Sequence, residues 1–141
     1  MLSNDDCIFC KIIEKEIPSK ILYENNETIA FLDNFPISQG HTIVIPKKHY
    51  TNLEDIPINI LYEIMGTVKK VSNLIYKNLK NDGYNILQNN YKAAGQIINH
   101  FHIHIIPRSI ADGKFKLIIP REQSSEEELN QTLKIIKDSK Y

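Results

Sequence analysis

The clearest periodic pattern lies in the middle of the chain. Apolar residues recur there at helical spacing, and lysines lie off the apolar stripe, as on a solvated helix face. Pro57 is typical of a helix start and Asn81-Asp82-Gly83 of a helix stop, so the pattern predicts one long helix between them. The apolar positions are Leu61, Ile64, Met65, Val68, Val71, Ile75 and Leu79.

Short runs rich in β-branched and aromatic residues flank this helix, and Asn, Gly and Pro separate them, which is typical of strands and turns. A short helix is expected at residues 7–14. Ser125 and Glu128 form a capping-box pattern that predicts a last helix, ending near residue 137. Residues 116–119 suggest a further short strand. The five main predicted strands cover residues 21–24, 28–33, 41–45, 84–88 and 100–107.

The order of these elements predicts the fold class. Strands precede and follow one long helix without regular β-α-β alternation, which favours an α+β fold. We expect a mostly antiparallel five-stranded sheet with the long helix, a C-terminal helix and the helices on one face. A length of 141 residues suits a single domain spanning residues 1–141. A small sheet has edges that need protection, so a homodimer is expected.

Composition narrows the class of protein. A hydrophobic fraction of 42% and a charged fraction of 24% are typical of a soluble globular protein. The 17 basic and 17 acidic residues give no net charge, which argues against a nucleic-acid partner. The chain shows neither a membrane-length apolar run nor a signal-peptide pattern, so we expect a cytoplasmic protein without a membrane partner.

Three of the five histidines recur at every second position, at His100, His102 and His104. In a strand such residues share one face, while Phe101 and Ile103 would face a core. A packed strand gains nothing from three imidazoles in register, so the pattern indicates chemistry. Three interpretations remain open: ligands of a catalytic zinc, a histidine nucleophile, or polar residues on an exposed sheet face.

Imidazole chemistry suits phosphorus. A reference pKa of about 6.5 keeps the ring mostly neutral near pH 7, and the neutral ring is a good nucleophile. The N–P bond is labile, so a covalent intermediate can be hydrolysed. Neighbouring imidazoles can fix the tautomer of the nucleophile and protonate a leaving group, and their mutual repulsion opposes simultaneous protonation. The run therefore suits a two-step phosphoryl or nucleotidyl transfer.

The context of the run carries a family resemblance. Cys7-Ile-Phe-Cys10, Asp33, the segment from Gly40 to His49, and the histidine run with its flanking Asn89–Gln96 and Pro107-Arg108 occur in this order. Together they resemble the histidine triad (HIT) family, and most closely its bacterial Hint-like branch, from about Cys7 to Arg108. The resemblance implies a homodimeric α+β fold whose sheet continues across the dimer, and nucleotidyl chemistry on a nucleoside monophosphate.

The resemblance also implies catalytic roles. His102 would attack the α-phosphorus, and water would then hydrolyse the nucleotidyl-His102 intermediate. His104 would donate a hydrogen bond to the phosphate or leaving group, and His41 would hold His102 in its reactive tautomer. Asp33 would accept hydrogen bonds from the two ribose hydroxyls, for which a carboxylate has enough acceptor sites.

The segment before the run would bind the rest of the nucleotide. By resemblance, Asn89 and Gln96 align with polar residues near the sugar and phosphate. Gly95 would let the backbone approach the phosphate closely. The backbone N–H groups of residues 95–97, including that of Ile97, would stabilise charge that develops at phosphorus.

Three positions depart from the family pattern. Ile97 stands where relatives usually carry Ser or Thr, so one hydroxyl donor to the phosphate is lost. Tyr91 stands where relatives commonly carry Gly, which would reshape the loop or cover the pocket. Asn34 replaces a commonly apolar residue beside the base.

The two cysteines form a C-x-x-C, which in a reducing compartment indicates a metal or redox site rather than a structural disulfide. In several HIT relatives this pair joins the histidine after Pro-Lys-Lys and the first triad histidine. The resemblance thus implies a structural zinc bound by Cys7, Cys10, His49 and His100, which divides the triad between metal binding and chemistry.

The resulting hypothesis is a nucleotide hydrolase or transferase that cleaves P–N or P–O bonds at a nucleoside α-phosphate. Adenosine phosphoramidates are expected substrates ahead of dinucleoside polyphosphates. Two other classes remain open: a zinc-dependent hydrolase that uses the triad as metal ligands, and a nucleotide-binding regulator with little turnover.

Overall fold

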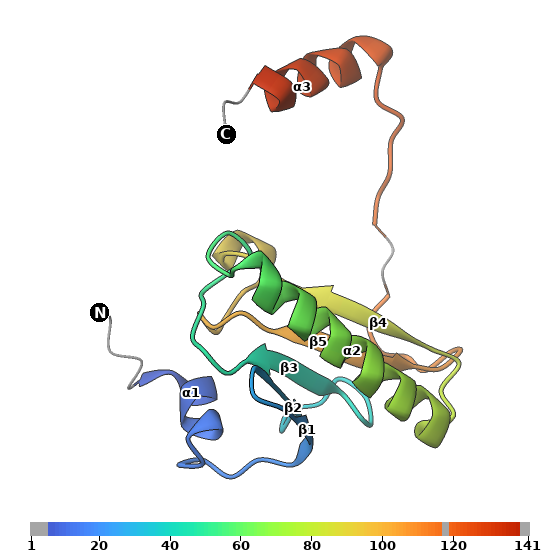
Figure 1. Cartoon of the computed structure of the whole chain (residues 1–141). Helices are drawn as coiled ribbons and strands as arrows, with labels where there is room; N and C mark the ends of the chain where they lie inside the picture. The colour runs from blue at the N-terminus through green and yellow to red at the C-terminus, as the bar shows by residue number, and fades with distance from the viewer. Residues whose placement is uncertain (1–5, 117–118, 139–141) are drawn as a thin grey trace.

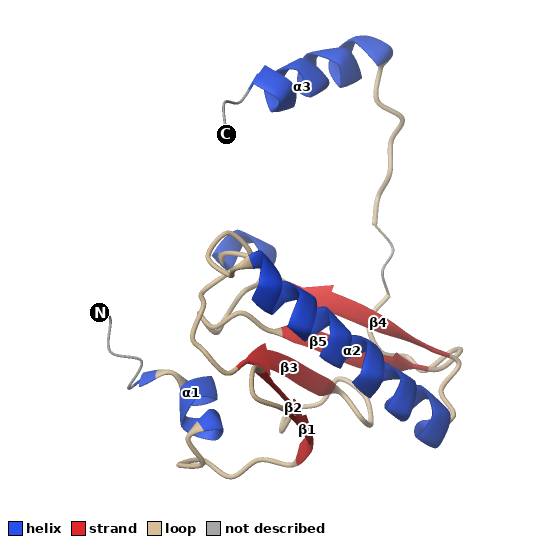
Figure 2. Cartoon of the chain, in the orientation of Figure 1, coloured by secondary structure: helices blue, strands red, loops and turns tan. Residues whose placement is uncertain are grey.

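A computed structural model describes residues 6–116 and 119–138 of the chain. Its centre is one antiparallel sheet of five strands in the order β1-β2-β3-β5-β4, crossed by the long helix α2 (Figure 1, Figure 2). The predicted α+β class is confirmed. The elements are α1 (Ile8–Ile13), β1 (Ile21–Glu24), β2 (Thr28–Leu32), β3 (Thr42–Pro46), α2 (Ile58–Leu79), β4 (Gly83–Gln88), the 3₁₀ helix η2 (Lys92–Ala94), β5 (Ile103–Arg108) and α3 (Glu126–Asp138).

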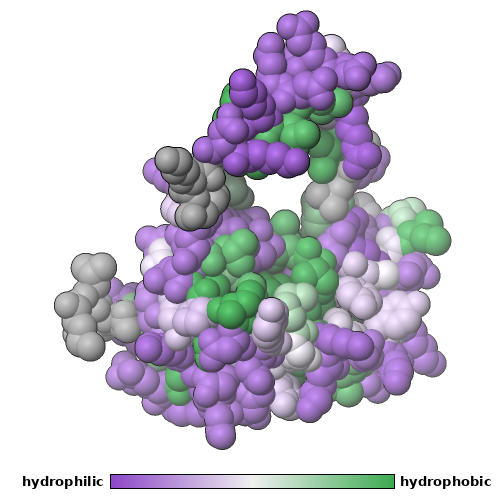
Figure 3. Space-filling model, turned by 45° about the horizontal axis from the view of Figure 1, so that its top comes forward, coloured by the Kyte–Doolittle hydropathy of each residue, from purple (hydrophilic) through white to green (hydrophobic). Residues whose placement is uncertain are grey.

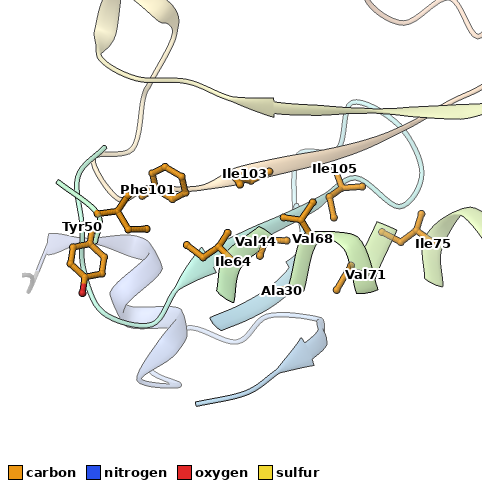
Figure 4. Close-up of a cluster of buried hydrophobic side chains, with 11 residues drawn as sticks. Ala30, Val44, Tyr50, Ile64, Val68, Val71, Ile75, Phe101, Ile103 and Ile105 are labelled. Atoms are coloured by element: carbon orange, nitrogen blue, oxygen red, sulfur yellow. The ribbon is translucent and has the colours of Figure 1, made fainter. Parts of the chain in front are cut away.

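Most of the stripe predicted for the long helix forms the main core, but Met65 and Leu79 are exposed. Ile64, Val68, Val71 and Ile75 of α2 are buried against one face of the sheet (Figure 4). Each fully buried side chain of this size contributes roughly 1.5–3 kcal/mol. The helix begins directly after Pro57. Its C-cap is Lys80, which has a left-handed backbone conformation and directly precedes Asn81. The sheet residues of this core include Ala30, Val44, Ile103 and Ile105.

A second apolar cluster covers the other face of the sheet. Phe9 and Ile12 of α1 pack there with Phe31 of β2 and Ile43 and Ile45 of β3. Successive strand residues point to opposite faces, so β3 is buried along its whole length between α2 and α1. The expectation that the helices lie on one face is therefore wrong, because α1 covers the face opposite α2.

The histidine strand starts later than predicted, because β5 begins at Ile103. In the observed register Val44 pairs with Ile103, so the two following pairs would join Ile45 to His102 and Pro46 to Phe101. Pro46 has no N–H to donate, and its carbonyl accepts a hydrogen bond from His100 Nε2 at 2.9 Å instead. The ladder therefore ends before Phe101, and only His104 of the three histidines lies on the strand.

The C-terminal helix α3 lies apart from the sheet in Figure 1. Its predicted capping box is present, because Glu128 N donates to Ser125 Oγ at 3.2 Å and Ser125 N donates to Glu128 Oε2 at 3.0 Å. One side of the helix is apolar and exposed (Figure 3), with Leu129, Leu133 and Ile136 at helical spacing. The predicted strand at 116–119 includes residues 117–118, which lie outside the described residues; Lys116 and Ile119 are not in a strand.

None of the described helices combines the length and the apolar character that a membrane crossing would need.

Candidate active site

A cavity of about 340 Å³ opens on the face of the sheet that α1 covers; we call it the histidine cavity. Its apolar walls come from α1, β2 and β3 and include Phe9, Phe31 and Ile43. Its polar lining includes Asp33, at the end of β2, and two histidines of the run. The cavity thus combines an apolar compartment with a polar end, which is the usual character of a small-molecule site.

His102 lies at the polar end with a defined tautomer. Its Nδ1 lies 2.7 Å from the carbonyl oxygen of His100, and a carbonyl only accepts, so Nδ1 carries the proton. Nε2 therefore keeps its lone pair. Burial lowers the pKa of His102, whereas the bond to the His100 carbonyl and the charge of Asp33 act in the opposite direction. A buried neutral imidazole with a free Nε2 is equipped to act as a nucleophile.

His104 is held by a chain of hydrogen bonds. The backbone N–H of Ile37 donates to His41 Nδ1 at 3.1 Å, so His41 Nε2 carries a proton and donates to His104 Nδ1 at 2.8 Å. His104 Nε2 then carries a proton and can donate. The pKa of His104 is lowered to about 4, first by burial and then by His102 and His41, while Asp33 opposes the shift.

The structure brings His102, His104 and His41 together, with ring centroids 4.9 Å apart for His102–His104 and 5.1 Å for His41–His104. One expectation changes, however. His41 was expected to fix the tautomer of His102, but the His100 carbonyl does so, and the hydrogen-bond partner of His41 is His104. The role assigned to His41 on the basis of sequence is corrected accordingly.

Asp33 lies beside this chain because its backbone N–H donates to the His41 carbonyl at 2.9 Å. One carboxylate oxygen, Oδ1, accepts from Phe35 N at 2.8 Å, and the other, Oδ2, lies 3.7 Å from His41 Nε2. Asn34 also lines the cavity. Asp33 therefore has acceptor capacity left for a ligand hydroxyl.

The loop before the histidine run closes another side of the cavity. Gly95 lines it with φ +91°, a left-handed conformation that favours glycine. A Cβ at Gly95 would lie 3.6 Å from Asn89 Nδ2, so Asn89 is next to the loop although it does not line the cavity. Ile97 lines the cavity with 92% of its surface exposed.

Gln96 does not line the cavity, in contrast to its predicted role in nucleotide binding. Its Nε2 donates to the carbonyls of Thr51 at 2.6 Å and Ile98 at 3.2 Å, and its Oε1 accepts from Tyr91 N at 2.8 Å. These three bonds use the amide to brace the loop. Tyr91 does not line the cavity either: it adopts φ +67°, and its hydroxyl donates to Glu54 Oε2 at 3.2 Å.

A second cluster lies next to His102; we call Cys7, Cys10, His49 and His100 the cysteine–histidine cluster. Their ligand atoms all lie within 4.8 Å of one another. Cys7 Sγ and Cys10 Sγ lie 3.5 and 3.6 Å from His100 Nδ1, and Cys10 Sγ lies 3.3 Å from His49 Nδ1. Bonds of about 2.3 Å to sulfur and 2.0 Å to nitrogen around a tetrahedral zinc would separate S and N by roughly 3.5 Å.

The protonation of this cluster also fits a metal. His100 donates through Nε2 to the Pro46 carbonyl, so the lone pair of Nδ1 faces the thiols. Burial lowers the pKa of His100 to about 4, which keeps the ring neutral. The pKa of the Cys10 thiol is raised to about 12, first by burial and then by Cys7, so only a cation would make it ionise readily. The donor atoms thus fit a closed Cys₂His₂ metal site.

This arrangement does not support the triad as one set of metal ligands. Among the described residues, no candidate metal group combines His100 with His102 and His104. His100 faces the thiols, and His104 is bonded to His41. The triad is instead divided between two sites.

Sequence reasoning missed several groups that shape the site. Phe9 lies between the two cysteines, and its apolar character within the predicted helix 7–14 could have marked it as a wall of the site. No sequence signal marks the carbonyl of Pro46 or the N–H of Ile37, because their partners depend on how distant segments meet.

Comparisons with known proteins bear on these observations. Residues 14–110 match the model of the HIT domain family. The adenosine 5'-monophosphoramidase HNT1 of Saccharomyces cerevisiae is 46% identical over 113 residues, which are 80% of this chain and 68% of that protein. The structure of a HIT family protein from Bacillus anthracis superimposes with a TM-score of 0.90 at 36% identity, covering 97% of this chain and 99% of that one.

A zinc-bound histidine triad family protein from Mycobacterium smegmatis is also similar, with a TM-score of 0.75 and 32% identity. The match covers 96% of this chain and 98% of that chain.

Proposed function

This chain belongs to the HIT family, and from that premise we propose that it hydrolyses P–N or P–O bonds at a nucleoside α-phosphate, with adenosine phosphoramidates as the preferred substrates. The observation that carries the proposal is the buried neutral His102, whose proton lies on Nδ1 and whose Nε2 is free. The phosphoramidase activity named for the yeast relative supports the choice of substrate.

The substrate would lie along the histidine cavity. The base would pack against the apolar walls that Phe9, Phe31 and Ile43 provide, and Asp33 Oδ2 would accept from the ribose hydroxyls. Gly95 would let the backbone approach the α-phosphate, where the N–H groups of residues 95–97 would stabilise charge.

The reaction would take two steps. His102 Nε2 attacks phosphorus, an N–P bond forms, the bond to the leaving amine breaks, and the amine takes up a proton from solvent. His104 Nε2–H donates a hydrogen bond to the phosphate or to the leaving group, oriented by His41. Water then attacks the phosphorus of nucleotidyl-His102, the N–P bond breaks, the water loses a proton to solvent, and the nucleoside monophosphate and free His102 are released.

The proposal is tested by trapping the intermediate. The protein is mixed with an adenosine phosphoramidate, quenched in base to preserve the N–P bond, and mapped by mass spectrometry. We expect AMP on His102 and none in His102→Ala, which should still bind AMP. Productive turnover with an unmodified His102 would rule out the covalent mechanism. Tight AMP binding without single-turnover cleavage would favour the alternative of a nucleotide-binding regulator with little turnover.

We also propose that the cysteine–histidine cluster binds a structural Zn²⁺. The donor distances support this, as does the zinc-bound relative. Four protein ligands leave no open position, so the metal would supply structural cross-links and no reaction step. Metal analysis should find about one zinc per chain, lost in Cys7→Ala. The proposed location is the cytoplasm, where reducing conditions keep both thiols free.

We further propose a homodimer whose sheet continues across the two chains. The edge strand β4 exposes Tyr84, Ile86 and Leu87, and an apolar edge of this kind needs a cover. Figure 3 shows further apolar surface on the body of the protein and on α3. Light scattering should give the mass of a dimer for the wild type and of a monomer for Ile86→Lys; a wild-type monomer would refute the proposal.

A further inference from the structure

His100 links the cysteine–histidine cluster to the nucleophile. Its Nδ1 lies 3.5 and 3.6 Å from the sulfur atoms of Cys7 and Cys10, and its Nε2 donates to the Pro46 carbonyl. Its backbone carbonyl accepts the Nδ1 proton of His102 at 2.7 Å. A displacement of His100 would therefore also displace the group that fixes the tautomer of His102.

Phe9 forms a second link. It lies between the two cysteines in sequence and is 4% exposed. Its ring centroid is 5.2 Å from that of His102 and 5.8 Å from that of His100, and both contacts are edge-to-face. Phe9 also lines the histidine cavity. One side chain thus contacts the cluster, the nucleophile and the substrate space.

The helix that carries Phe9 depends on such anchors. α1 has only 6 residues, no side-chain N-cap bond and no acidic residue in its first turn. Isolated helices shorter than about 12 residues are not stable in water, so α1 must be held by tertiary contacts. The anchors are its apolar packing, through Phe9 and Ile12, and the cysteine–histidine cluster, which includes Cys10 of the helix and the N-cap residue Cys7.

We propose that metal binding by the cysteine–histidine cluster positions His102, through the His100 backbone and through Phe9. Phe9 is then a positioning residue for the nucleophile as well as a wall of the cavity. Groups that orient a site from behind typically change activity by about 10–100-fold when lost, and a misplacement of about 1 Å can cost on the order of 100-fold. The inference rests on the proposed nucleotidyl chemistry, but its effect on AMP binding and on the His102 ring does not require turnover.

The first test compares metal-free and zinc-loaded protein in reducing buffer. Two readouts are independent of catalysis: the AMP dissociation constant from calorimetry, and the ¹⁵N NMR signals of His102, which report its tautomer. We expect about tenfold weaker AMP binding and a mixed His102 tautomer in the metal-free protein, both restored by zinc. Equal affinity and an unchanged tautomer would overturn the proposal, as would a wild-type protein that binds no metal under any condition.

A pair of variants keeps the test valid even where metal removal unfolds the protein. Phe9→Leu retains all four metal ligands and should keep about one zinc per chain. It should still alter the His102 signals without nucleotide and lower kcat about tenfold. Val68→Ala, in the core on the opposite side of the sheet, is the matched control, with lower stability but wild-type His102 signals and kcat. Identical His102 signals in the two variants would overturn the role of Phe9.

These outcomes separate the inference from the proposed function. A zinc-loaded wild type that forms no His102 adduct and cleaves no phosphoramidate would refute the proposed function alone. The AMP affinity and the tautomer of His102 would then still decide whether the cluster positions the ring.

Discussion

The two ends of the histidine run have different partners although they lie only four residues apart. His100 precedes β5, is fully buried and faces two thiols, whereas His104 lies on β5, lines the histidine cavity and is bonded to His41. The difference teaches that a regular spacing brings side chains close together, but the segments that meet each side chain decide what it can bind.

Burial has the same effect on the histidines at both ends of the run. The pKa values of His100 and His104 are each lowered to about 4, and burial is the largest cause in both cases. At His100 the neutral ring offers a lone pair to a metal, and at His104 it accepts from His41 through Nδ1 and can donate through Nε2. Burial therefore suits a metal ligand and a hydrogen-bond donor equally well.

The largest effect is expected for a change at His102, which should affect catalysis but not metal binding. His102→Ala removes the nucleophile and should lower kcat on the order of 10⁴-fold or more. Zinc content should remain about one per chain, because His102 is outside the cysteine–histidine cluster. The measurements are steady-state kinetics and metal analysis. A His102→Ala variant with kcat within tenfold of wild type would show that the histidine run is not divided between a metal-binding end and a catalytic end.

His49→Ala perturbs the other end. It removes one of the four donors, so metal binding should be lost and the melting temperature should fall by about 10 °C, for a loss of about 3 kcal/mol. We expect kcat to fall only about tenfold, because His102 and His104 remain. Calorimetry, metal analysis and kinetics check this. Unchanged metal content and melting temperature would contradict the assignment of His49.

Ile97→Ser should raise kcat slightly and leave metal binding unchanged. The new hydroxyl can donate to the phosphate, and one hydrogen bond of about 1 kcal/mol corresponds to roughly a fivefold rise in kcat. Ile97 is 92% exposed, so the free energy of unfolding should change by less than about 0.5 kcal/mol. Ile110→Ser, at another exposed position, is the kinetic control. A slower Ile97→Ser enzyme would show that the apolar side chain assists catalysis.

The smallest effect is expected on changing pH. The lowered pKa of His104, about 4, keeps this ring neutral well below pH 6.5, so kcat/KM should vary less than about twofold between pH 8 and 6. The sign for stability follows from linkage: the unfolded chain binds this proton first, so stability falls as the pH drops from about 6.5 to 4. A pH–rate profile with an acid limb centred near 6.5 would contradict the burial of His104.

Much of the fold could be predicted because its signals are local. The observed bounds of β1 are the predicted ones, α2 follows the apolar stripe, and α3 starts at the predicted capping box. The start of β5 could not be predicted, because it depends on Pro46 of the paired strand, more than fifty residues earlier in the chain. The placement of α1 on the opposite face likewise depends on long-range packing.

The candidate site, like the fold, has some features that the sequence predicted and others that depend on contacts between distant segments. The sequence supplied the residue types, and the family resemblance supplied the association of Cys7 and Cys10 with His49 and His100, whose ligand atoms the structure brings within 4.8 Å. Neither the sequence nor the resemblance could show that the side-chain amide of Gln96 is bonded to the Thr51 carbonyl and the Tyr91 N–H. These hydrogen bonds form only when the loops meet. The same applies to the pairing of His41 with His104.

The sequence by itself determined most of the strands and helices and which side chains carry reactive nitrogen and sulfur, because periodicity and residue chemistry are local properties. Only the tertiary structure decided which nitrogen of each imidazole carries the proton. That choice depends on single backbone groups: the Pro46 carbonyl for His100, the His100 carbonyl for His102, and the Ile37 N–H, through His41, for His104. The reason is that a hydrogen bond is short and directional, so its partner is settled only when the chain has packed.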